Sequence, residues 1–156
     1  MEPRFNLYGN PVATSFTKRL TMASKVIDDS TLDKATYELV KLRASQINGC
    51  GYCTDMHFKD AVHAGESTTR LNLVAAWHEA TVFTEAERAA LALTEEATRV
   101  ADGGHVSDDT WERVRKHFDD DQTAALIAAI AMINAWNRMN AIARTPAGDY
   151  VPGQWG

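Results

Sequence analysis

The two cysteines of the 156-residue chain lie three positions apart, in the sequence Cys50-Gly51-Tyr52-Cys53. This spacing suits an intramolecular disulfide that closes a very small loop. Because so small a loop restricts little chain entropy, the bond would stabilise the fold only modestly, and a redox role is the better interpretation. In a reducing compartment, two close cysteines are typically catalytic or bind a metal.

A histidine, His57, follows Cys53 by four positions. On one helix these two side chains would share a face, one turn apart. The imidazole could then take the proton of the Cys53 thiol or stabilise its thiolate, which is the usual activation of a nucleophile. A cysteine at a helix N-terminus also has its thiolate favoured by the helix dipole. The cluster therefore predicts a reactive thiol pair on a loop that leads into a helix.

Other uses of the cysteine pair fit less well. A structural zinc site lacks a fourth ligand, because His63 lies six residues after His57 and would face away from it on a regular helix. Attachment of a c-type haem needs a histidine directly after the second cysteine, where the chain has Thr54. Two buried, inert cysteines beside a surface histidine remain a third interpretation. A thioredoxin-like fold needs a βαβ context, which the sequence does not show.

The remaining sequence is typical of helices joined by short polar connections, because no segment alternates between apolar and polar with a period of two. Capping residues and glycines predict helices at about 32–47, 53–65, 67–77, 84–101, 107–118 and 122–144. Asn48 and Gly49 end the first of these helices and allow the second helix to fold back along it. The tail 145–156 is expected to be irregular. We predict an all-α, single-domain helical bundle over residues 1–156.

The last predicted helix is apolar around most of its circumference, so it must be covered on most sides. A partner subunit is the expected cover, which predicts a homo-oligomer. Aromatic residues elsewhere are interpreted as core or subunit contacts (Trp77, Phe83, Trp111 and Trp136), and in the tail as contacts with a neighbour (Tyr150 and Trp155). Three histidines are interpreted as surface or structural (His78, His105 and His117), and the acidic run Asp119–Asp121 as favouring a helix N-terminus.

The composition excludes some classes of partner. The net charge of −5 argues against nucleic acid or an anionic membrane, because both favour a basic protein face. The most apolar stretch, Ala124–Ile133, is far shorter than the roughly 20 residues that span a bilayer. No targeting segment is recognisable, and we expect the protein in the cytoplasm.

The motif around the cysteines resembles the alkylhydroperoxidase D-like (AhpD-like) branch of the carboxymuconolactone decarboxylase family. The pattern of that branch is Glu, eleven residues, Cys-x-x-Cys, three residues and His, and Glu38, Cys50, Cys53 and His57 fit it without a gap. The stretch 77–94 is similar to small single-domain members. The resemblance extends over roughly residues 20 to 140.

The resemblance implies an all-α fold that assembles as a homotrimer or homohexamer, without cofactor or metal. It implies that Cys53 attacks a peroxide, that Cys50 resolves the resulting sulfenic acid into a disulfide, and that Glu38 and His57 relay a proton. The best-known members have His between the cysteines, where this chain has Tyr52, which cannot titrate near neutral pH as His can.

The placement of Glu38 is the harder geometric expectation. If the helix after Gly49 folds back along the preceding one, His57 is expected nearer Arg43 or Ser45 than Glu38. A tilted crossing or a bridging water would then have to close the gap, and one water is enough for relay chemistry.

The leading functional hypothesis is a thiol-dependent peroxidase that is restored by a dithiol reductant, by family analogy a protein-bound lipoyl group. A carboxymuconolactone decarboxylase-like enzyme is the alternative enzymatic interpretation, although members with that chemistry generally lack the cysteine pair. A non-enzymatic oligomeric redox sensor is a third interpretation. Turnover distinguishes the peroxidase from the sensor, because a sensor oxidises once and stops.

Overall fold

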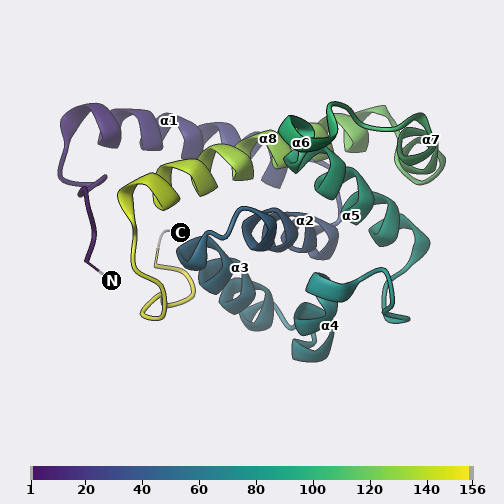
Figure 1. The fold of residues 1–156 in the computed structure, drawn as a ribbon, viewed down its shortest axis with the longest axis horizontal. Coiled ribbons are helices and arrows are strands. Elements are labelled where there is room, and N and C mark those ends of the chain that lie inside the picture. The colour runs from purple at the N-terminus through teal and green to yellow at the C-terminus, as the bar shows by residue number, and fades with distance from the viewer. Residues whose placement is uncertain (1, 155–156) are drawn as a thin grey trace.

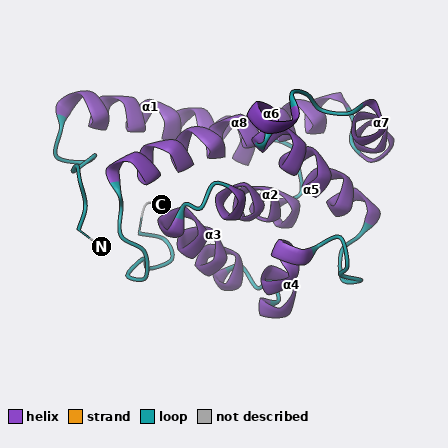
Figure 2. Ribbon diagram, in the orientation of Figure 1, coloured by secondary structure: helices purple, strands orange, loops and turns teal. Residues whose placement is uncertain are grey.

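The computed structural model describes residues 2–154, and within that range every regular element is a helix (Figure 2). The elements in chain order are α1 (Pro11–Asp28), α2 (Lys34–Ile47), α3 (Gly51–His63), α4 (Thr68–Leu73), the 3₁₀ turn η1 (Val74–Ala76), α5 (Glu85–Thr98), α6 (Val100–Gly103), α7 (Asp108–His117) and α8 (Asp120–Ala143). The predicted all-α class is confirmed. The 84–101 helix is interrupted at Arg99, and residues 145–154 form an irregular tail.

The central helix is α2, which contacts α3, α5 and α8 (Figure 1). Its adjacent residues Leu39 and Val40, which are 1% and 0% exposed, belong to two different apolar clusters. Val40 packs in the cluster shared with α5, α7 and α8, and Leu39 in the cluster shared with α3, α4 and η1. The polar residues of α2 contact several neighbouring helices: Glu38 faces α3, Arg43 contacts α5 and Ser45 contacts α8.

Several predicted capping residues act as expected, although α2 begins at Lys34 after the cap Asp33 and not at residue 32. Thr84 and Glu87 form a capping box at the start of α5. Ser67 and Ser107 cap α4 and α7 through their hydroxyls. Asp119, the first residue of the acidic run, caps α8 and forms a capping box with Gln122. These side chains accept the backbone N–H groups that a helix start leaves without a partner, which explains why the helix starts follow from the sequence.

The helix α1 was not predicted. It begins at Pro11 after the cap Asn10, a favourable start, but its side chains are arranged contrary to the usual amphipathic pattern. Four of its large apolar residues point outward, with exposed fractions of 78% for Val12, 52% for Phe16, 65% for Met22 and 73% for Val26, whereas Ile27 near its end is buried. Its opposite face is a row of threonines and a serine. The helix lies along α8 (Figure 1).

The aromatic residues divide between core and surface. Trp77 and Phe83 are buried in the core, as predicted, whereas Trp111 is 40% exposed and Trp136 is half-buried. Tyr150 does not need a neighbour, because its hydroxyl donates to the Asp60 carboxylate of its own chain at 2.9 Å. Trp155 lies outside the described residues. No helix in the described range is both long and apolar enough to cross a membrane.

Candidate active site

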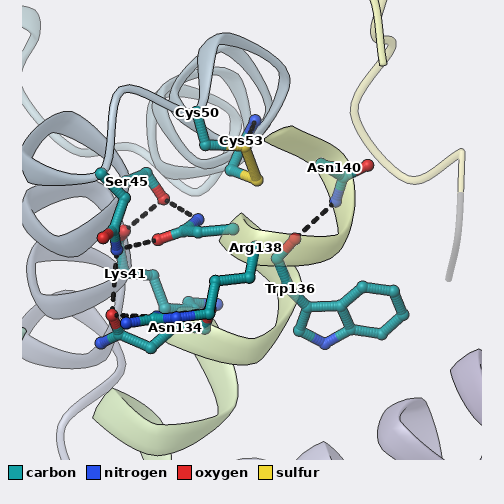
Figure 3. Close-up of a disulfide and its surroundings, with 10 residues drawn as sticks. Lys41, Ser45, Cys50, Cys53, Asn134, Trp136, Arg138 and Asn140 are labelled. Atoms are coloured by element: carbon teal, nitrogen blue, oxygen red, sulfur yellow. Dashed lines mark hydrogen bonds between the residues drawn. A yellow bond between two sulfur atoms is a disulfide. The ribbon is translucent and has the colours of Figure 1, made fainter. Parts of the chain in front are cut away.

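The turn between α2 and α3 positions the cysteines. Gly49 has a φ of 64°, a left-handed conformation that ends a helix at little cost for glycine. Cys50 follows in an extended conformation as the N-cap of α3, and its Sγ accepts the backbone N–H of Cys53 at 3.3 Å. A disulfide joins Cys50 to Cys53, with Cα atoms 5.4 Å apart (Figure 3). Cys53 therefore lies in the first turn of α3, where the helix dipole favours a thiolate.

A cluster of amides and a hydroxyl fastens this turn to α8. Asn48 Nδ2 donates to Asn134 Oδ1 at 3.0 Å and lies 2.9 Å from the amide oxygen position of Asn137. The Asn137 amide also lies 3.0 Å from Ser45 Oγ (Figure 3). Asn137 is fully buried. The sequence analysis did not single out these asparagines, although two amides three residues apart on an otherwise apolar helix are a recognisable signal of a buried polar contact.

The histidine and the glutamate of the predicted relay lie in direct contact. His57 is 6% exposed, and its Nδ1 lies 3.3 Å from Glu38 Oε2. The expectation that His57 lies nearer Arg43 or Ser45 is wrong. Arg43 is directed to Glu95 of α5 at 2.7 Å, and Ser45 to Asn137 of α8. Glu38 is thus the group of α2 that reaches the imidazole, and no bridging water is needed.

The charges in this contact favour a carboxylate beside a neutral imidazole. Burial opposes the ionisation of Glu38, but the facing imidazole and the Lys41 ammonium outweigh it and lower the pKa of this carboxyl to about 2. Burial lowers the pKa of His57 below its ordinary value, although the Glu38 carboxylate acts in the opposite direction. The 3.3 Å contact is poorly aligned for a hydrogen bond, and neither atom has another partner among residues 2–154. Catalytic contacts are often loose in this way before substrate binds.

A cavity of about 630 Å³ lies beside these residues, and α1, α2, α3, α8 and the tail all contribute to its wall. Cys53, His57 and Glu38 line it, whereas Cys50 does not. Tyr52 lines it as well, with its ring edge-on to Tyr150 at 6.3 Å between centroids. A small molecule in the cavity would therefore meet Cys53 and not Cys50.

The described residues offer no alternative metal centre. Within residues 2–154, no three His, Cys, Asp or Glu side chains are grouped so that they could hold a metal ion. His63, the fourth ligand that a zinc site would need, is exposed at the end of α3. His78 contacts Glu95 at 3.3 Å and stacks on Trp77, which is a structural position away from the cysteines.

Comparisons with known proteins address the family and the fold of the chain. The sequence pattern that defines the carboxymuconolactone decarboxylase family matches residues 14–96. The uncharacterized protein YdfG of Bacillus subtilis is 36% identical over 140 residues, which cover 90% of this chain and 93% of YdfG. The crystal structure of an Agrobacterium tumefaciens protein of unknown function, described as a candidate antioxidant defence protein AhpD, is 35% identical, with a TM-score of 0.89 over 96% of this chain and 100% of that one.

Similarity to proteins named alkyl hydroperoxide reductase AhpD is more local. The alkyl hydroperoxide reductase AhpD of Rhodopseudomonas palustris is 38% identical over 95 residues, or 58% of this chain and 51% of the reductase. The chain thus spans about half the length of that relative. The matched sequence pattern, the long alignment with YdfG and the shared fold together show that the chain belongs to the AhpD-like branch of the carboxymuconolactone decarboxylase family.

Proposed function

We propose that the protein is a thiol-dependent peroxidase in which Cys50 and Cys53 cycle between dithiol and disulfide. The observation that carries the proposal is the Cys50–Cys53 disulfide at the start of α3, one turn before a buried histidine that faces a partly buried carboxylate. This arrangement supplies a nucleophile, a base and a group that orients the base. The antioxidant description of the Agrobacterium relative supports the same assignment.

In the proposed cycle, His57 takes the proton of Cys53, and the thiolate attacks the terminal oxygen of a hydroperoxide. The O–O bond breaks, an alcohol or water leaves with a proton from His57, and Cys53 becomes a sulfenic acid. Cys50 then attacks the sulfur of Cys53, so that the S–S bond forms and water leaves. The assignment of Cys53 as the attacking residue is supported by its place on the cavity wall, which Cys50 does not share.

The proposed reductant is a small dithiol, and a protein-bound lipoyl group is the source we favour. Cys50 and Cys53 are 2% and 1% exposed, so the thiol of a folded protein partner cannot reach either sulfur without opening the structure. A slender dithiol arm can enter a cavity of about 630 Å³ and exchange with the disulfide. We place the cycle in the cytoplasm, where reducing systems keep such dithiols available.

We also propose that the protein works as a homotrimer or homohexamer. The outward apolar face of α1 (Val12, Phe16, Met22 and Val26) is unusual for an isolated subunit. In α8, Ile127 is 51% exposed and borders a groove of about 590 Å³ between α5, α7 and α8. Both surfaces would be covered by contacts between identical chains.

A steady-state assay tests the enzymatic proposal. Loss of an alkyl hydroperoxide should continue well beyond one equivalent when dihydrolipoamide is in excess, and a Cys53→Ser protein should show none of it. A single equivalent consumed, with no turnover on any dithiol, would identify a redox sensor instead. Consumption of 4-carboxymuconolactone by the wild-type and Cys53→Ser proteins alike would favour the decarboxylase.

A further inference from the structure

Lys41 is the second charged partner of Glu38. Its Nζ lies 2.6 Å from Glu38 Oε1, on the carboxylate oxygen opposite the one that faces His57. The Lys41 side chain is 15% exposed, and Nζ also lies 3.9 Å from the centre of the Tyr37 ring. A lysine held this closely, on the wall of the cavity, differs from the freely solvated ion pairs that are common at a spacing of three residues.

The charged groups around His57 come from three helices. They are Glu38 and Lys41 on α2, Asp60 on α3, and Lys18 and Asp28 on α1. The tyrosines of the same cavity stay uncharged near neutral pH. Among the cations of the described cavity wall, only Lys41 contacts the Glu38 carboxylate.

We propose that Lys41 is a positioning residue of the thiol site, which holds Glu38 against His57 and balances the carboxylate charge so that the imidazole stays an uncharged base. The role of that base toward Cys53 rests on the proposed function. The arrangement of Lys41, Glu38 and His57 does not.

The physical reason is charge balance in a poorly solvated site. Glu38 is partly buried, and its Oε2 atom, which faces His57, is buried. Its charge requires a positive partner, because an unpaired charge away from water is strongly unfavourable. With Lys41 present, that partner is permanent and His57 can remain neutral. Without Lys41, the nearest remaining source of positive charge in contact with Glu38 is a proton on His57 itself. The lysine thus takes the place of that proton and leaves the imidazole free to accept one from the thiol.

The direct test is an NMR titration of His57 in the disulfide form, in which neither cysteine titrates. Lys41→Met and Lys41→Gln should raise the pKa of His57 by about one, the lower end of the range for loss of a nearby charge. Lys41→Arg should leave it unchanged. Lys34→Met is the matched control, because it removes one positive charge from an exposed position of the same helix. Thermal melting should show that each protein is folded before titration.

The same variants give a second readout in the dithiol form. The acid limb of the pH profile for Cys53 alkylation should move to higher pH in Lys41→Met, with a rate about tenfold lower along that limb. An unchanged His57 titration in both neutral variants overturns the proposal, as does an equal change in Lys34→Met or a Lys41→Arg protein that titrates like Lys41→Met. If His57 responds as expected but no variant, and not the wild type, consumes peroxide, the Lys41 assignment stands and the peroxidase proposal falls.

Discussion

The Glu38 carboxylate faces the His57 imidazole across the α2–α3 turn, with Oε2 3.3 Å from Nδ1. His57 in turn follows Cys53 by one helical turn on α3, and both line the same cavity. In the proposed cycle, a proton that leaves the thiol would pass to this imidazole, and the carboxylate would stabilise the imidazolium that forms. The contact joins two helices, so it depends on how α2 and α3 pack and not only on local sequence.

Removal of either proposed relay residue should slow the alkylation of the Cys53 thiol at neutral pH. We expect Glu38→Gln and His57→Gln to lower the rate of Cys53 alkylation by about a hundredfold near pH 7, the low end of general-base effects. Much of the loss should be recovered at high pH, where the thiol ionises without help. The measurement is a pH series with iodoacetamide on the fully reduced proteins. Variants that match the wild type in alkylation and peroxide turnover at every pH would leave only the cysteine pair in the site.

Oxidation should stay within one chain. Mild peroxide should convert the dithiol protein to a form whose intact mass is lower by two hydrogens, because the Cys50–Cys53 disulfide forms within a short loop. Cys50→Ser should instead trap a sulfenic acid on Cys53 that reacts with dimedone. Disulfide-linked dimers of the wild-type protein on non-reducing gels, or a dimedone adduct in Cys53→Ser and none in Cys50→Ser, would reverse these assignments.

Acid should destabilise the fold through the same pair. Burial lowers the pKa of His57 in the folded protein below its ordinary value of 6.5, so the unfolded chain binds more protons as the pH falls through 6.5. Stability from this residue is therefore present above pH 6.5 and is lost on acidification. Glu38, with a pKa of about 2 against an ordinary 4.5, adds a second loss as the pH falls from 4.5 toward 2. Urea midpoints between pH 8 and 3 should show both decreases.

The variant His57→Gln separates the two groups. It should flatten the decrease just below pH 6.5, whereas His117→Gln, at an exposed position of α7, should retain it. A decrease of the same size in His57→Gln would assign the acid sensitivity to other residues.

The apolar face of α1 should hold the assembly together. We expect a trimer or hexamer by sedimentation at micromolar concentration, and a shift to smaller species in Phe16→Asp, because a charge at a covered apolar position is unfavourable. Val62→Asp places the same charge at an exposed apolar position of α3 and should keep the wild-type mass. A wild-type monomer under these conditions would contradict the prediction.

The amide cluster behind the turn should be important for stability. Asn137→Ala removes a buried side chain beside Ser45 and Asn48, so we expect a loss of about 1–3 kcal/mol in the free energy of unfolding. Asn72→Ala makes the same change at an exposed position of α4 and should change that free energy by less than about 0.5 kcal/mol. Equal urea midpoints for the two variants would show that the cluster does not stabilise the turn.

The sequence predicted those features that depend on neighbouring residues. The cysteine spacing, the helical interval from Cys53 to His57 and the capping box at Thr84 all follow from local geometry, and the structure has them. The acidic run at Asp119 also lies at a helix N-terminus, as predicted. Helix α1 was not predicted because most of its large apolar residues face outward. The amphipathic pattern that indicates a helix places such residues on the face toward the core. Its start signal, Asn10 followed by Pro11, was available.

Contacts between helices were harder to predict. The position of Glu38 along α2 predicts that Arg43 or Ser45 lies nearer His57. In the structure, Arg43 instead binds Glu95 of α5 and Ser45 contacts Asn137 of α8. The sequence does not indicate a role for Lys41 in the site, because a lysine three residues after a glutamate is common on a helix surface. Only the packing of α1, α3 and α8 around that face makes the pair part of a cavity.

The turn at Gly49 places all four residues of the site within one helix–turn–helix segment, from Glu38 to His57. The segments that must meet are close in sequence, so bringing them together involves little loop-closure entropy. The four residues are therefore brought together by a short stretch of chain, while α8 fastens the turn and α1, α8 and the tail complete the cavity wall. A chain of different length could carry the same hairpin. Substitutions in the cavity wall would then change what the site accepts without changing the order of its four residues.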